Sequence, residues 1–187
     1  MKKLKHFFII LTFSSCLYPN IDYVQNTLIN VDINYDFEKI QIKDLDTDGD
    51  LDIISIYQDH RFGWYENIGL NEYTYRSIAN AYDGPSDINI VDLDHDGDMD
   101  ILISVEDGHN AAVGVPNEFL IAWFENDGLE NFTQNVIEPG TDYGGNFITA
   151  LFPVDLDHDG DIDILSANRE LSQISWYKND GSENFSL

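Results

Sequence analysis

The sequence predicts an all-β fold built from β-propeller blades of four antiparallel strands, with about three blades present. The first observation is a nine-residue, aspartate-rich segment that occurs three times, at residues 44–52, 92–100 and 155–163. The second is that the same order of short apolar segments and turns follows each copy. Four-stranded units repeating every 48 or 63 residues, without an amphipathic helix between them, are typical of propeller blades.

The first two strands of each repeat flank the aspartate-rich segment. The strand before it alternates apolar and polar positions, as Ile88 and Ile90 show. The strand after it is a short apolar run, and the three runs are IISIY from Ile53, ILISV from Ile101 and ILSA from Ile164. The segment itself is therefore predicted to be the loop of a β-hairpin.

The third strand of each repeat contains a tryptophan. Two large apolar residues spaced two apart face the same side of a strand, and the three pairs are Phe62 with Trp64, Ile121 with Trp123, and Ile174 with Trp176. At a repeated strand position these tryptophans are expected in the core between blades, although stacking on sugars is the alternative. An Asn-Ile-Gly or Asn-Asp-Gly turn follows, with glycine supplying a positive φ.

The fourth strand is expected to begin at an aromatic residue nine positions after each tryptophan, namely at Tyr73, Phe132 and Phe185. Residues 23–28 (YVQNTL) resemble such a strand, ahead of the first complete repeat. Closed propellers typically have four to eight blades. Two explanations stay open for three blades: the chain is part of a longer parent, which we favour, or several copies associate.

The N-terminal residues 1–16 are predicted to be an export signal. Lys2, Lys3 and Lys5 precede the apolar run of residues 7–13, which is too short to span a bilayer. Residues 13–16 (FSSC) then resemble a lipobox. Lipid attachment at Cys16 or ordinary signal cleavage nearby both place the mature chain outside the cytoplasm, as a secreted protein or a surface or periplasmic lipoprotein.

The composition is strongly acidic but still that of a folded protein. The 187 residues include 9 Lys+Arg against 35 Asp+Glu, a formal net charge of −26, while 43% are hydrophobic and 13% aromatic. Such a charge excludes binding to nucleic acid or to anionic membranes through basic surfaces. It favours a divalent cation as the partner that offsets the clustered carboxylates.

Each aspartate-rich segment is predicted to bind one calcium ion. Aspartate occupies loop positions 1, 3, 5, 7 and 9, and glycine occupies position 6, where it permits a sharp turn. Calcium prefers six to eight hard oxygen ligands, and carboxylates so closely spaced repel one another without a cation. An EF-hand would need Glu at position 12, where this chain has Ser55, Ile103 and Ser166.

The pattern D-x-D-x-D-G-x-x-D before an apolar strand resembles the FG-GAP/VCBS repeat family, which includes the integrin α-subunit propeller. The resemblance covers about residues 21–187, although the literal Phe-Gly and Gly-Ala-Pro sequences are absent. It implies structural Ca²⁺, about three ions per chain, bound by side chains at positions 1, 3, 5 and 9 and by the carbonyl at position 7. The implied side-chain ligands are Asp44, Asp46, Asp48 and Asp52; Asp92, Asp94, Asp96 and Asp100; Asp155, Asp157, Asp159 and Asp163. The implied carbonyls are those of Asp50, Asp98 and Asp161.

The remaining candidate residues give weaker indications of function. His95 and His158 stand at loop position 4 and are expected to point outward, and His60 and His109 are isolated. The second repeat is lengthened within residues 106–117, an insertion expected opposite the calcium loops, either as a binding loop or as a tolerated surface insertion.

Two functions of different classes follow. The first is a non-catalytic extracellular calcium-binding module for adhesion or for binding an unknown protein or glycan. The alternative is the propeller fragment of a polysaccharide-active enzyme such as a lyase, which would need a basic residue near a carboxylate in a cleft. The scarcity of Lys and Arg disfavours the enzyme, and the missing EF-hand features disfavour a calcium sensor.

Overall fold

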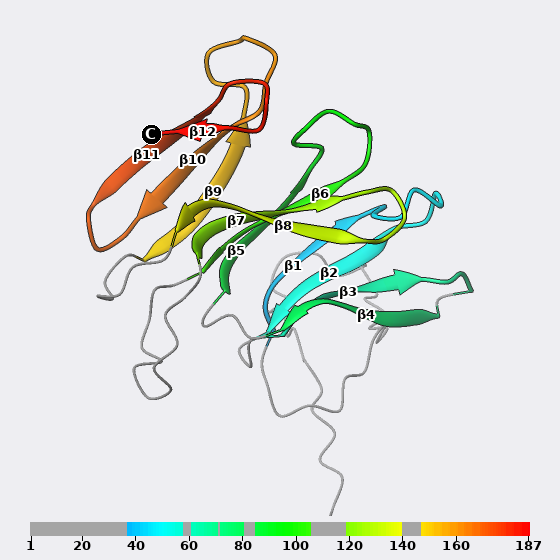
Figure 1. Cartoon of the computed structure of the whole chain (residues 1–187). Coiled ribbons are helices and arrows are strands. Elements are labelled where there is room, and N and C mark those ends of the chain that lie inside the picture. Colours follow the sequence, from blue (N-terminus) through cyan, green and yellow to red (C-terminus); the bar gives the residue numbers. More distant parts are fainter. Residues whose placement is uncertain (1–36, 58–60, 71, 81–84, 106–118, 140–146) are drawn as a thin grey trace, which may run out of the picture. The chain divides into compact units, whose positions relative to one another are not determined.

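Three four-stranded antiparallel sheets make up the described part of the chain (Figure 1). The structure is a computed structural model, and it describes residues 37–57, 61–70, 72–80, 85–105, 119–139 and 147–187. In each sheet the strands follow one another in chain order, so that every pairing joins consecutive strands. The predicted all-β fold of propeller-type blades is thereby confirmed; the three sheets do not form a closed ring.

The strand bounds match the predicted repeat. The first sheet contains β1 (Phe37–Lys43), β2 (Asp52–Tyr57), β3 (Arg61–Asn67) and β4 (Tyr73–Asn80). The second contains β5 (Pro85–Val91), β6 (Asp100–Val105), β7 (Phe119–Asn126) and β8 (Phe132–Pro139). The third contains β9 (Ile148–Val154), β10 (Asp163–Asn168), β11 (Gln173–Asn179) and β12 (Phe185–Ser186). The fourth strand of each sheet begins at the predicted aromatic residue.

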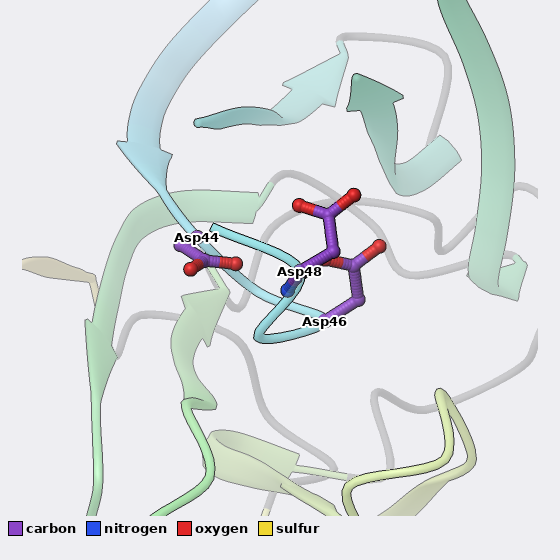
Figure 2. Close-up of side chains that lie close together, drawn as sticks. All are labelled: Asp44, Asp46 and Asp48. Atoms are coloured by element: carbon purple, nitrogen blue, oxygen red, sulfur yellow. Dashed lines mark hydrogen bonds between the residues drawn. The ribbon is translucent and has the colours of Figure 1, made fainter. Parts of the chain in front are cut away.

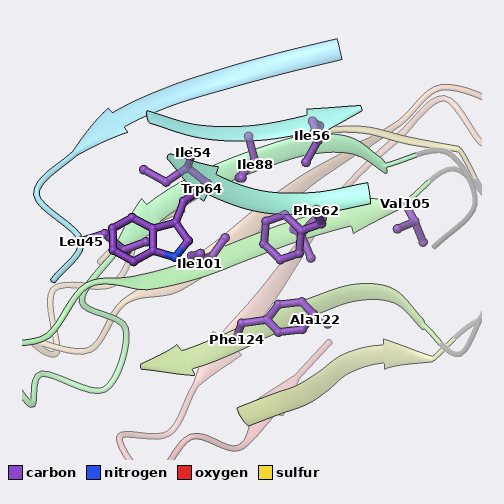
Figure 3. Packing of buried hydrophobic residues seen from close by; sticks show 11 residues of the cluster. Leu45, Ile54, Ile56, Phe62, Trp64, Ile88, Ile101, Val105, Ala122 and Phe124 are labelled. Atoms are coloured by element: carbon purple, nitrogen blue, oxygen red, sulfur yellow. The ribbon is translucent and has the colours of Figure 1, made fainter. Parts of the chain in front are cut away.

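Two apolar clusters hold adjacent sheets together. In the first, Trp64 and Phe62 of β3 pack with Ile88 of β5 and with residues of β6 and β7 (Figure 3). The rings of Phe62 and Phe124 meet edge to face, with centroids 5.2 Å apart. The second cluster joins the second and third sheets and contains Trp123, Leu102, Ile148, Leu151 and Tyr177. Trp64 and Trp123 are each 1% exposed, as expected for residues of the core between blades.

A repeated polar contact links the first strands of neighbouring sheets. The side-chain amide of Gln41 donates to the carbonyl of Ile88, at 3.1 Å, and that of Asn89 donates to the carbonyl of Leu151, at 3.2 Å. Gln41 and Asn89 occupy the same position of their repeats, three residues before the aspartate loop. The equivalent residue of the third sheet is Phe152, which has no such donor.

The third sheet exposes the face that the first two sheets bury. Phe152, Leu165 and Trp176 lie side by side across β9, β10 and β11. Phe152 is 62% exposed, Trp176 39% and the neighbouring Ile174 77%. The prediction that all three tryptophans are buried between blades is therefore wrong for Trp176, because no described segment covers this face.

None of the described segments forms a helix with the length and apolar character needed to cross a bilayer.

Candidate metal centres

The three aspartate-rich segments are the loops between the first and second strands of each sheet. Gly49, Gly97 and Gly160 at loop position 6 have φ angles of 97°, 101° and 103°, which confirms the sharp turn predicted there. The residues at position 4 also have positive φ, at 60° for Thr47, 63° for His95 and 64° for His158. Two residues of positive φ, separated by one residue, curl the loop so that alternate side chains converge.

Carboxylates at loop positions 1, 3 and 5 come together in all three repeats. In each group one oxygen from every residue lies within 4.8 Å of the others. The three groups are Asp44, Asp46 and Asp48; Asp92, Asp94 and Asp96; Asp155, Asp157 and Asp159. Figure 2 shows the first group on its tightly curled loop. The structure therefore brings together nine of the side chains predicted to bind calcium.

Backbone N–H groups of each loop donate hydrogen bonds to oxygens of these carboxylates. In the first loop, Asp46 Oδ1 accepts the N–H of Asp48 at 3.2 Å, and Asp48 Oδ1 accepts the N–H of Asp50 at 2.8 Å. Asp44 Oδ2 accepts the N–H of Gly49 at 3.1 Å. The same pattern of i to i+2 bonds recurs from Asp94 and Asp96, and from Asp159. In these six carboxylates one oxygen is thus fixed by the backbone, which orients the other.

Two oxygens at position 1 have the environment of an ion ligand. Asp44 Oδ1 and Asp92 Oδ1 are buried from solvent and have no hydrogen-bond partner among the described residues. A buried carboxylate oxygen without a donor is costly unless a cation neutralises it. An all-oxygen donor set of this kind suits Ca²⁺. The residues present therefore fit the ion that the repeat pattern implies.

The raised pKa values of carboxylates in the first two loops also fit a cation site. Burial, together with the carboxylates of Asp52, Asp48 and Asp44, raises the pKa of Asp46 to about 6. Burial and neighbouring carboxylates likewise raise the pKa of Asp94 above its usual range. The first two loops thus concentrate negative charge, and a divalent cation would relieve the repulsion between their carboxylates.

Aspartates at loop position 9 have a structural role that the sequence did not predict. Asp100 is fully buried; its Oδ2 accepts the N–H of Leu93 and its Oδ1 accepts the N–H of Asn126, both at 2.9 Å. Asp52 and Asp163 form the same two bonds in their own repeats, at 2.8–3.2 Å. Each of these carboxylates clamps its loop to the end of the third strand. Their further role as calcium ligands stays a prediction.

Burial dominates the protonation of this clamp. It raises the pKa of Asp100 to about 7 even though two backbone N–H groups favour the ionised form. The pKa of Asp52 is raised in the same direction and for the same first cause.

Aspartates at loop position 7 lie against the hairpin turn that follows the third strand in the second and third repeats. A Cβ added at Gly128 would meet the carboxylate of Asp98, and one at Gly181 would meet Asp161 Oδ2 at 2.6 Å. Both glycines belong to the hairpin turn after the third strand and have positive φ, as predicted for that turn. The expected contribution of the position-7 carbonyls to calcium binding stays a prediction.

Three asparagines complete the support of the loops, and we interpreted them from sequence only as turn residues. Asn67, Asn126 and Asn179 end the third strands. Each side-chain amide donates to the carbonyl of loop position 8, at 3.2–3.3 Å, and each side-chain oxygen accepts the N–H of the hairpin glycine two residues on. Their recurrence immediately before the turn, in all three repeats, is the sequence feature that could have predicted this supporting role.

His95 and His158 are exposed, as expected for loop position 4. His95 nevertheless makes a contact that sequence did not predict, because its Nε2 lies 2.9 Å from the carbonyl oxygen of Gly160 in the third loop. The predicted signal with Cys16, the residues His60 and His109, and the insertion at 106–117 lie outside the described residues.

Comparison with known proteins supports the repeat. Residues 44–103 match the family described as FG-GAP-like repeat, from the first aspartate loop into the strand that follows the second loop. No curated protein matches the chain.

Proposed function

We propose that the chain, which contains an FG-GAP-like repeat, is a non-catalytic calcium-binding propeller module that works outside the cytoplasm. The observation that carries the proposal is the convergence of carboxylates at positions 1, 3 and 5 in three separate loops. One acidic cluster on a surface is common, but the same three positions on the same curl, repeated three times, favour a shared ligand. The buried, partnerless oxygens of Asp44 and Asp92 add to this.

Calcium in these loops would be structural. The side chains at positions 1, 3 and 5 would hold the ion, with position 9 and the position-7 carbonyl completing the shell. The ion supplies positive charge at the turn that joins the first two strands of a blade. The chain's own residues do the rest: the position-9 aspartate and the strand-end asparagine fix the loop to its sheet, so that the ion meets a site already shaped.

The expected setting and partners follow from the charge and the N-terminus. Extracellular calcium modules bind with dissociation constants of about 10⁻⁴–10⁻³ M, which suits a compartment rich in calcium. The net charge of −26 and the predicted signal at residues 1–16 support such a location. The partner would be a protein or a glycan, and a membrane would be involved only through a lipid anchor at Cys16.

Isothermal titration calorimetry on chelator-stripped protein tests the proposal. We expect three calcium ions per chain at saturation, one per loop. Asp48→Asn should remove one of them, whereas Thr47→Ser at the neighbouring position, outside the predicted donor set, should remove none. A count of zero or one at millimolar calcium would rule the proposal out. Glycan and protein arrays probed with and without EDTA would then identify the partner.

A further inference from the structure

One position beside the aspartate loops changes its charge between repeats. The residue between the aromatic that follows the tryptophan and the strand-end asparagine is Glu66 in the first repeat, Glu125 in the second and Lys178 in the third. The three residues are equivalent in register, because each follows its tryptophan by two positions on the third strand.

The first two repeats have glutamates here, and the charge of Glu66 is partly offset by Arg76, whose Nη2 lies 2.7 Å from Glu66 Oε2. An oxygen of Glu66 lies within 4.8 Å of Asp46 and of Glu130. In the second repeat, Glu125 holds the equivalent position on β7, two residues after Trp123. Glu66 is thus an acidic neighbour of loop position 3, and the equivalent residue of the second repeat is acidic as well.

The lysine does the opposite in the third loop. Lys178 Nζ forms an ion pair with Asp157 at loop position 3 and lies 3.2 Å from Asp159 Oδ2 at position 5. The ammonium group therefore contacts two of the three carboxylates that converge in this loop.

We infer that Lys178 is an internal counter-ion of the third loop, and that this loop consequently binds calcium more weakly than the first two. The inference rests on the proposed function. A divalent ion entering the loop must break the contacts of Lys178 with Asp157 and Asp159 and then tolerate a positive charge nearby. Because the lysine side chain is 41% exposed, it can swing into solvent, so that the third site is weakened rather than abolished.

The size of the effect follows from simple electrostatics. A divalent ion repels a lysine twice as strongly as a single charge does, so a displaced lysine that stays about 4 Å from the ion weakens binding by roughly tenfold or more. The same contact gives the third loop a partial substitute for calcium. Removal of calcium should therefore disturb the third hairpin less than the first two.

Calorimetric titration of the wild-type protein and of Lys178→Glu tests the inference. The wild type should show two tighter sites and one weaker site, and Asp155→Asn should abolish the weaker class. Lys178→Glu restores the residue of the other repeats and should tighten the weak site about tenfold or more. Lys178→Met, which keeps the aliphatic stem without the charge, should fall between the two.

A reciprocal variant and a calcium-free measurement distinguish a failure of this inference from a failure of the proposed function. Glu125→Lys should convert the second loop into a weak site while leaving the first unchanged. In EDTA, Lys178→Met should melt at a lower temperature than the wild type, because it loses the ion pairs. Three equal sites, unaltered by Lys178→Glu, would overturn the inference while leaving the proposed function intact. Wild-type protein that binds no calcium would instead defeat the proposed function and, with it, the affinity order.

Discussion

The side-chain amide of Asn126 donates a hydrogen bond to the carbonyl oxygen of Leu45, 3.1 Å away, and so ties the second sheet to the aspartate loop of the first. The two residues are 81 positions apart in sequence, and both are buried. The same amide also reaches the carbonyl of Met99 in its own loop, at 3.2 Å. One side chain thus links two of the candidate calcium loops.

Asn126→Ala should therefore destabilise the protein more than Asn67→Ala does. The first variant leaves buried carbonyls of two loops without a donor, which costs roughly 2–3 kcal/mol of unfolding free energy. The described bonds of the Asn67 side chain stay within its own repeat, and that variant should cost about 1 kcal/mol. Urea unfolding at fixed calcium measures both. Equal losses would show that the link to Leu45 contributes nothing.

Tryptophan substitutions should destabilise the protein more where the tryptophan is covered by a neighbouring sheet than where it is exposed. Trp123→Ala should lower the unfolding free energy by about 3–5 kcal/mol, because it opens a cavity between two sheets. Trp176 holds the equivalent position but is 39% exposed, so Trp176→Ala should cost about 1 kcal/mol or less. Thermal melts of the two variants provide the comparison. Similar losses would mean that another part of the protein covers Trp176.

Alanine at the hairpin glycines should distinguish conformational strain from collision. Gly69 and Gly128 have φ angles of 84° and 71°, so an L-residue at either costs about 1–2 kcal/mol. An added Cβ meets open space at Gly69, whereas at Gly128 it lies 3.0 Å from Cγ of Asp98. Gly128→Ala should thus be the more destabilising change, and should also weaken calcium binding. Identical melting curves would argue against the packing of Asp98 on this turn.

Calcium-free protein should become more stable as the pH falls from neutral. Burial raises the pKa of Asp100 to about 7, and that of Asp46 to about 6, in the folded chain. A carboxyl whose pKa rises on folding takes up a proton, so unfolding free energy increases as the pH drops from about 7.5 to about 5. Melting temperatures in EDTA across this range test the sign.

Asp100→Asn provides the control, because an amide does not titrate. That variant loses stability at every pH, since the amide N–H₂ faces a backbone N–H, but its pH dependence should be shallower. Calcium should flatten the wild-type dependence as well, because the ion competes with protons for the loops. Stability that falls steadily between about pH 7 and pH 5 in EDTA would contradict the assignment.

Chelation should lower the melting temperature, and magnesium should restore it poorly. At about ten times the dissociation constant, calcium adds on the order of 1.4 kcal/mol per site. For a chain of this size that corresponds to about 2–4 °C per kcal/mol. Magnesium requires a smaller octahedral shell and keeps its water. A melting curve indifferent to EDTA would show that the loops do not stabilise the fold through calcium.

The strand order and turns could be predicted because each repeat carries its own local markers. The glycines at loop position 6 and in the hairpin turn demand positive φ, and the tryptophan sets the position at which the fourth strand begins. These signals act over about ten residues and need no partner. The convergence of Asp44, Asp46 and Asp48 follows from the same local curl.

Features that depend on a neighbouring repeat could not be predicted. Trp123 and Trp176 occupy equivalent positions of their repeats, and their burial differs because β9 of the third sheet packs near Trp123 whereas no described strand covers Trp176. The contacts of Asn126 with Leu45 and of His95 with Gly160 join residues 81 and 65 positions apart. The sequence shows a lysine at position 178 where the other repeats have glutamate, but only the structure shows that it contacts Asp157 and Asp159.

Because every described strand pairs with the next strand in the chain, this topology affects both folding during synthesis and the evolution of the repeats. Hydrogen-bonded partners close only short loops, so each sheet can complete itself as soon as its own residues have left the ribosome or translocation channel. No strand waits for a distant partner. A whole repeat can then be duplicated or deleted without rethreading the others, provided that the new neighbours present matching apolar faces.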